Sequence, residues 1–151
     1  MNLQMEINSL KQRIAELEEH VKEEQEFPKM GDIYWRIDDR VSVDNCMYNN
    51  YYTDNHRQAI GNFFKTEQEA EFAIEKLKVE AELRKFSRPY EHGRFNYYLF
   101  FNIESDSLDT QFTSYCPPQG AIYFESEEKT QEAVSVVGKE RIKKYIFGVE
   151  D

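Results

Sequence analysis

Three residues that could do acid–base chemistry lie close together in the segment TDNHRQ: Asp54, His56 and Arg57. A histidine can act as a general base when a carboxylate orients its ring, and an arginine can hold an anionic substrate. A small hydrolase or a nucleotide-binding enzyme is the function that such a loop would serve. We favour a simpler interpretation, in which Asp and Asn cap a turn and His56 is solvated, because no nucleophile or substrate site is recognisable.

Four potential zinc ligands occur in the chain, but their spacing argues against a metal site. They are Cys46, His56, His92 and Cys116. Zinc prefers thiolate and imidazole ligands, yet these four are spaced unlike any common pair of zinc ligands. We expect free cysteines that fill small apolar gaps. The sequence also lacks the motifs of phosphate loops, dinucleotide sites, metalloproteases and serine hydrolases, so we assign no catalytic residue, no metal and no cofactor.

The charge of the chain disfavours direct binding to nucleic acid. Its 151 residues include 29 acidic and 19 basic side chains, which gives a net charge of -10. Such a chain repels phosphate backbones and lacks the Lys and Arg that supply affinity for them. No apolar run is long enough to cross a membrane and no signal sequence is recognisable, so we expect a soluble cytoplasmic protein.

The elements that would position these residues begin with a long helix. Residues 2–26 contain no Gly or Pro, and apolar residues recur there in alternating steps of four and three. This heptad stripe consists of Leu3, Ile7, Leu10, Ile14, Leu17 and Val21. We therefore predict a coiled-coil stalk over residues 1–26, followed by a globular domain over residues 27–151 that contains all the aromatic residues.

The heptad pattern favours a parallel homodimer over a helix that folds back on its own domain. The residues at a are β-branched and those at d are leucine, which is the combination typical of two parallel strands. In that register Glu6 faces Lys11 of the second copy, and Arg13 faces Glu18 of the second copy. A helix docked on its own chain has no need of these matched charges.

The globular domain is expected to open with a strand in which Ile33, Trp35 and Ile37 share the buried face. We predict a turn at DDR, then a loop or irregular strand over residues 44–62. Thr66 and Glu69 form a capping-box signature, which predicts a helix that runs to about Phe86. Its expected core stripe is Ala70, Ala73, Ile74, Leu77 and Ala81.

The second half of the chain repeats this order. We predict a strand with one face formed by Tyr97, Leu99, Phe101 and Ile103, a partner strand over residues 109–116, and a helix capped by Ser126. A short basic helix follows Gly138; its Lys and Arg complement the helix dipole or, alternatively, bind an anion. Phe64 aligns with Phe124, and YWRIDD is matched with FFNIES.

We therefore expect an α+β fold in which an N-terminal coiled-coil helix precedes a small antiparallel sheet packed with helices. The repeated order is consistent with a duplicated βα-type module with halves at about 31–88 and 94–149. The strands of both halves would then pair in one sheet. Chance recurrence of an N-cap after an aromatic strand is the alternative, and the sequence favours neither.

Two segments carry a resemblance to a known group of proteins: GNFFKTEQEAEFAIEKLK and VGKERIKKYIFGV. They resemble small accessory proteins, of no assigned function, from phages and prophages of Gram-positive bacteria. The resemblance covers most of residues 30–149, and its motifs are structural. It implies a mobile-element context in a bacterial cytoplasm, where small acidic proteins bind and block host factors, as anti-CRISPR proteins do.

Our leading hypothesis is a non-enzymatic, acidic, phage-type protein that binds and inhibits a host protein. A defence nuclease is one candidate target, because acidic helix surfaces can match a basic groove that ordinarily holds nucleic acid. Tyrosines are favoured at binding hot spots, so the predicted contact residues are Tyr48, Asn50, Tyr51 and Tyr52. The alternatives are the enzyme described above and a structural or scaffolding component of a phage assembly.

Overall fold

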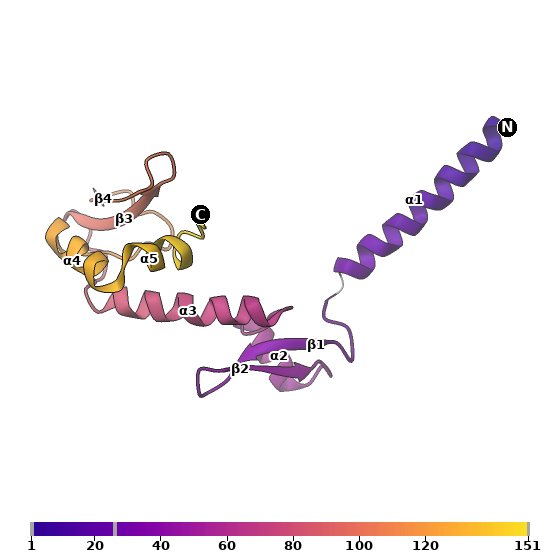
Figure 1. The fold of residues 1–151 in the computed structure, drawn as a ribbon, viewed down its shortest axis with the longest axis horizontal. Helices are drawn as coiled ribbons and strands as arrows, with labels where there is room; N and C mark the ends of the chain where they lie inside the picture. The colour runs from indigo at the N-terminus through magenta and orange to yellow at the C-terminus, as the bar shows by residue number, and fades with distance from the viewer. Residues whose placement is uncertain (1, 26, 151) are drawn as a thin grey trace. The chain divides into compact units, whose positions relative to one another are not determined.

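The computed structural model describes residues 2–25 and 27–150, and its elements confirm the expected α+β class with a long N-terminal helix (Figure 1). The chain divides into two compact units, Met1–Ala70 (unit 1) and Glu71–Asp151 (unit 2). The division falls inside helix α3 (Glu67–Arg84), so this helix contributes its first residues to unit 1 and the rest to unit 2.

Helix α1 (Leu3–Gln25) has the predicted bounds to within a residue or two. Its described side chains are exposed throughout. This includes the whole heptad stripe, whose exposed fractions range from 38% at Ile7 to 73% at Leu3. Within unit 1, to which α1 belongs, no described residue covers this stripe.

Unit 1 contains an antiparallel hairpin of β1 (Ile33–Ile37) and β2 (Val43–Met47), joined at the predicted DDR turn. Phe64 extends this hairpin, because its backbone exchanges two hydrogen bonds of 2.8 Å with Trp35. The predicted buried face is wrong for Ile33, which is exposed, whereas Tyr34 is fully buried. The reason is that the Tyr34 ring stacks on Phe63 at 4.0 Å between centroids.

The segment predicted as a loop over residues 44–62 is more regular than expected. It contains β2 and a two-turn helix, α2 (Tyr52–Ala59). Asn, Asp, Tyr and His have low helix propensity, so little in the sequence indicates α2. A tertiary hydrogen bond to Asp54, described in the next subsection, stabilises this helix despite its low intrinsic propensity.

Helix α3 begins at the predicted capping box. The backbone N–H of Glu69 donates to Oγ1 of Thr66 at 3.2 Å, and the carboxylate of Glu69 accepts from the N–H of Thr66 at 3.4 Å. The predicted core stripe is correct at Ala70 and Ile74, which are buried, and wrong at Leu77 and Ala81, which are exposed.

The second half of α3 is buried on its other side. Val79 and Leu83 are buried in unit 2, and at about 3.6 residues per turn they lie opposite Ala70 and Ile74. The helix thus has two apolar faces rather than one stripe.

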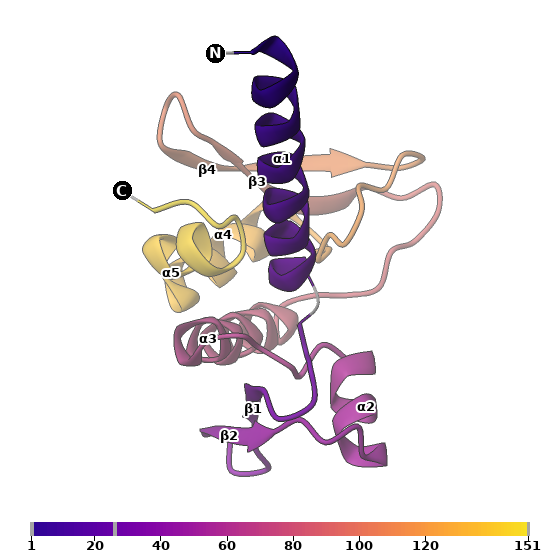
Figure 2. The ribbon, with the colours of Figure 1, turned by 90° about the vertical axis from the view of Figure 1, so that its right-hand side faces the viewer.

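Unit 2 is a two-layer arrangement. The hairpin of β3 (Asn96–Asn102) and β4 (Ser107–Thr113) has helices α4 (Glu127–Val137) and α5 (Lys139–Tyr145) on one side (Figure 2). The buried core joins α3, α4, α5 and the segment before α4, and consists of Val79, Leu83, Phe124, Ala133, Val137 and Ile142. Ser126 caps α4 as predicted, since its Oγ accepts from the N–H of Lys129 at 3.1 Å. The prediction for Ile103 is wrong, because it lies beyond β3 and is exposed.

The two halves share one local plan, but their strands do not form one sheet. Each half has a two-stranded hairpin, a phenylalanine that bridges the first strand, and a helix with an N-cap two residues later. Phe124 bridges Tyr97 as Phe64 bridges Trp35. The sequence match of YWRIDD with FFNIES pairs Trp35 with Phe101, whereas the bridges pair Trp35 with Tyr97, so the match is out of register. The strands of the second hairpin are longer, so its turn lies farther along the chain from the bridge at Phe124.

Candidate functional site

The residues predicted to contact a partner follow β2 and end at Tyr52, the first residue of α2. Tyr51 and Tyr52 are 66% and 75% exposed, Asn50 is exposed, and Tyr48 is half-buried. We refer to residues 48–52 as the tyrosine segment. Two large aromatic side chains exposed side by side in the chain are available for contact with another molecule.

Polar contacts fix the shape of the tyrosine segment. The Tyr48 hydroxyl donates to Oδ1 of Asn50 at 3.1 Å, and the Asn55 side-chain amide donates to the same oxygen at 3.1 Å. Asn50 has a φ of 56°, in the left-handed region that Asn tolerates better than most residues. The Tyr52 ring lies against His56, with 3.9 Å between centroids. These contacts hold the segment in one conformation.

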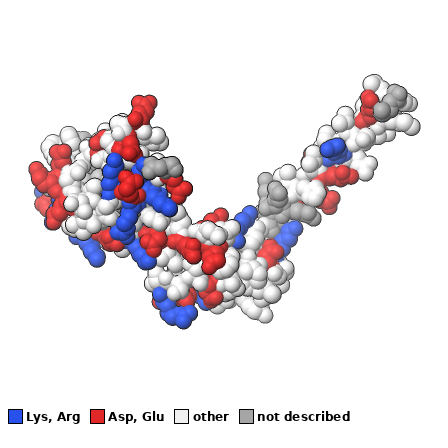
Figure 3. Space-filling view, viewed as in Figure 1, with Lys and Arg blue, Asp and Glu red and all other residues white. Residues whose placement is uncertain are grey.

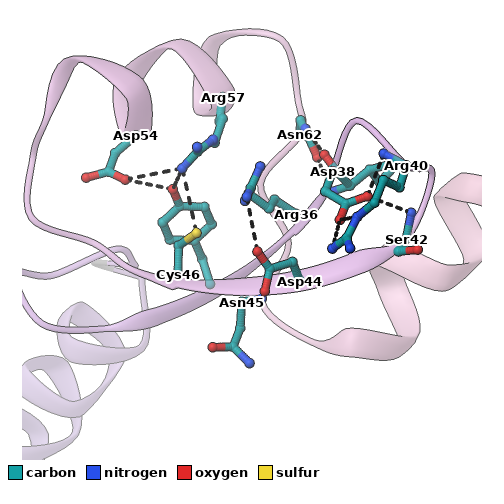
Figure 4. A network of polar contacts seen from close by, with 12 residues as sticks. Arg36, Asp38, Arg40, Ser42, Asp44, Asn45, Cys46, Asp54, Arg57 and Asn62 are labelled. Atoms are coloured by element: carbon teal, nitrogen blue, oxygen red, sulfur yellow. Dashed lines mark hydrogen bonds and ion pairs between the residues drawn. The ribbon is translucent and has the colours of Figure 1, made fainter.

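Asp54 anchors this segment, and its carboxylate points toward Arg57 (Figure 4). It is almost fully buried, and its Oδ2 accepts from the backbone N–H groups of Asn49 at 3.0 Å and Tyr51 at 3.1 Å. Its Oδ1 accepts from the Tyr34 hydroxyl at 2.7 Å. A buried carboxylate needs such partners, and the bond from Tyr34 holds the pKa of Asp54 below its usual range.

Arg57 completes the network. Its Nη1 donates to the Tyr34 hydroxyl at 2.8 Å, lies 3.9 Å from Oδ1 of Asp54, and is 3.7 Å from Sγ of Cys46 (Figure 4). Burial, together with the hydrogen bond to Asp54, raises the pKa of Tyr34 to about 12. Every member of the network is thus engaged with another member, which favours a structural role over a chemical one.

The enzyme hypothesis required Asp54 to orient His56, and this contact is not formed. His56 is exposed, and its only ring contact among the described residues is with Tyr52. The structure brings Asp54 and Arg57 together with Tyr34, a residue that the sequence did not single out. The strand alternation assigned Tyr34 to the solvent face, so the only available signal was its aromatic side chain.

The described residues contain no group of three or more His, Cys, Asp or Glu side chains that could hold a metal ion. Both cysteines are free thiols. Cys46 is half-buried beside Arg57. Cys116 is exposed on the loop after β4, so the prediction that both cysteines fill apolar gaps is wrong for Cys116.

The basic residues of the last helix are paired within unit 2. Lys143 and Lys139 lie 2.9 and 3.8 Å from the carboxylate of Asp106, and Arg141 makes two bonds of 2.9 and 3.0 Å to Glu82. Acidic and basic side chains are intermingled on the face drawn in Figure 3. These basic side chains are therefore engaged by acidic side chains of the same unit, an arrangement that neither prediction, dipole complementation or anion binding, included.

Unit 2 contains a cavity that the sequence did not predict. Its volume is about 360 Å³. Residues from α3, β3, the loop at 118–122 and the segment after α5 line it, and most of them are apolar. Leu83 and Phe124 of the buried core form part of its wall. No local motif marks such a cavity, because four segments distant in sequence create it.

Among the described helices, none has the length and apolar character needed to cross a membrane. Comparisons with protein-family models, with curated proteins and with solved structures found no match to this chain. The surfaces described above are therefore the observations that bear on function.

Proposed function

We propose that this protein is a non-enzymatic binding protein that works as a parallel homodimer. In this proposal α1 forms a two-stranded coiled coil, and the tyrosine segment of each copy contacts a partner protein. The observation that carries the proposal is the exposed stripe of α1, in which six apolar side chains at heptad spacing lie uncovered.

A second copy of the chain is the occupant that best fits this stripe. Burial of one large aliphatic side chain is favourable by about 1.5–3 kcal/mol of free energy. Burial of the whole stripe against another apolar surface is therefore strongly favoured. The β-branched a residues and leucine d residues select two parallel strands.

The charges that flank the stripe agree with this occupant. Glu6, Lys11, Arg13 and Glu18 make no ion pair or side-chain hydrogen bond among the described residues, so all four are available to the second copy. Glu6 would pair with Lys11 of the second copy, and Arg13 with Glu18. Both pairs are attractive only when the two helices run parallel and in register.

The partner in this proposal is a protein of the bacterial host, bound and inhibited in a phage or prophage context. Its support is the net charge of -10, the exposed Tyr51 and Tyr52, and the resemblance of two segments to phage accessory proteins. A basic groove of an RNA-guided nuclease is one surface with the required charge. Two tyrosine segments in one dimer would raise the avidity for a partner that offers two sites.

The oligomeric state is the direct test of the proposal. Light scattering coupled to gel filtration should give the mass of two chains for the wild type at tens of micromolar, and the mass of one chain for Leu10→Asp with Ile14→Asp. The matched control, Ser9→Asp with Gln12→Asp, adds the same charge at positions outside the stripe and should remain a dimer. A wild-type protein with the mass of one chain at this concentration would rule the proposal out.

The tyrosine segment is tested separately, with the dimer as internal control. Tyr51→Ala with Tyr52→Ala should keep the dimer mass and lose the host protein that the wild type captures from a bacterial lysate. Equal capture by wild type and variant would remove the tyrosine segment from the proposal and leave the coiled coil in place.

A further inference from the structure

The cavity of unit 2 has the features of a small-molecule site. Its volume of about 360 Å³ falls within the usual range for ligand pockets, which is about 300–1,000 Å³. Its apolar wall includes Leu99, Ile122, Phe124 and Phe147. Such pockets combine an apolar wall with a few polar groups that select the ligand.

Two charged side chains on α3 line the same cavity: Glu80 and Arg84. They are four residues apart, so their Cβ atoms are about 5–6 Å apart on one side of the helix. This spacing favours an ion pair between them. None is formed, and neither side chain has an ion pair or a hydrogen bond with any described residue. One carboxylate and one guanidinium thus remain available beside an apolar space.

We propose that this cavity binds a free α-amino acid with an aromatic or large aliphatic side chain. Such a ligand carries an ammonium and a carboxylate on one carbon, next to an apolar group. Arg84 can bind the carboxylate through two parallel N–H···O bonds, and Glu80 can accept hydrogen bonds from the ammonium. The apolar side chain would occupy the space beside Phe124 and Phe147.

The presence of both charges is what selects a zwitterion. A ligand with only a carboxylate would pair with Arg84 but bring its charge close to Glu80. A ligand with only an amine would pair with Glu80 but bring its positive charge close to Arg84. Like charges placed together lower affinity, so a ligand that offers both charges avoids both penalties. This inference does not depend on the proposed function, since unit 2 carries the cavity whether or not α1 dimerises.

Three ligands of one shape separate the two charges: L-phenylalanine, phenethylamine and 3-phenylpropionate. They should be titrated into the full chain and followed by two-dimensional amide NMR. L-phenylalanine should bind about two- to fivefold more tightly than either of the others, as expected for a solvent-accessible ion pair. Its shift changes should map to α3, β3 and the loop at 118–122.

Two variants assign the charges to residues. Glu80→Gln should weaken L-phenylalanine and phenethylamine but not 3-phenylpropionate, and Arg84→Gln should weaken L-phenylalanine and 3-phenylpropionate but not phenethylamine. Lys85→Gln, an exposed neighbour on α3, is the control for loss of one charge and should bind all three ligands as the wild type does. Equal affinities for the three ligands, or no shift changes at this cavity up to about 10 mM, would overturn the proposal.

Discussion

The hydroxyl of Tyr34 donates a hydrogen bond of 2.7 Å to Oδ1 of Asp54, and this bond joins strand β1 to the first turn of α2. Both residues are buried. Tyr34→Phe removes the donor and leaves a buried carboxylate short of one partner, which should lower the free energy of unfolding by about 1–3 kcal/mol in urea denaturation. Tyr98→Phe, whose hydroxyl bonds Gln111 at the surface, is the control and should cost less.

Asp54 should make the stability of the protein depend on pH. The pKa of this carboxyl is below its usual range in the folded protein, chiefly because of the bond from Tyr34. A lowered folded-state pKa gives stability that is present above the unfolded-state value of about 3.9 and is lost as the pH falls through the folded value. Urea midpoints measured from pH 6 to pH 2 should therefore fall less steeply for Asp54→Asn than for the wild type; parallel curves would contradict this.

The charges beside the α1 stripe should set the affinity of the proposed dimer. Lys11→Glu places two carboxylates opposite each other twice per dimer, and should raise the dissociation constant about tenfold if each contact is worth ~0.5–1 kcal/mol. Adding Glu6→Lys to this variant restores an attractive pair and should restore the affinity. Sedimentation velocity at low salt measures both, because salt screens exposed pairs. Failure of the second change to restore the affinity would exclude the parallel, in-register dimer.

Two leucines on α3 should differ sharply in their contribution to stability. Leu83 is 2% exposed within the unit 2 core, whereas Leu77 is 57% exposed. Leu83→Ala should lower the free energy of unfolding by about 2–5 kcal/mol, as deletions in cores do. Leu77→Ala should change it by less than about 0.5 kcal/mol, since it is a surface substitution. Equal losses in urea denaturation would show that the exposed face of Leu77 is covered in solution.

Local sequence signals predicted the helices and strands of this fold well. They failed to predict burial where it depends on contacts between residues distant in sequence. Thr66 and Ser126 cap their helices as predicted, because a cap is a contact within a few residues of the chain. The burial of Tyr34 depends on Phe63 and Asp54, which lie 20 or more positions away and left no periodic signal.

The candidate sites show the same limit. The heptad spacing of apolar residues predicted the α1 stripe, and the binding properties of tyrosine side chains suggested the tyrosine segment. The cavity beside Glu80 and Arg84 depends on four segments that meet only in the folded chain, so no pattern in the sequence marks it. The predicted burial of Leu77 is wrong for a related reason: α3 has apolar residues on two sides, and only the tertiary structure decides which of them are buried.

The order of the core residues along the chain has a consequence for synthesis on the ribosome. The buried core around Val79 and Leu83 also contains Ile142 of α5, so it cannot form until α5 has been translated, long after α1. At about 5–20 residues per second, α1 is exposed for seconds before the unit 2 core can close. In the proposed dimer, two chains translated from one messenger RNA would therefore join through α1 while both are still attached to their ribosomes.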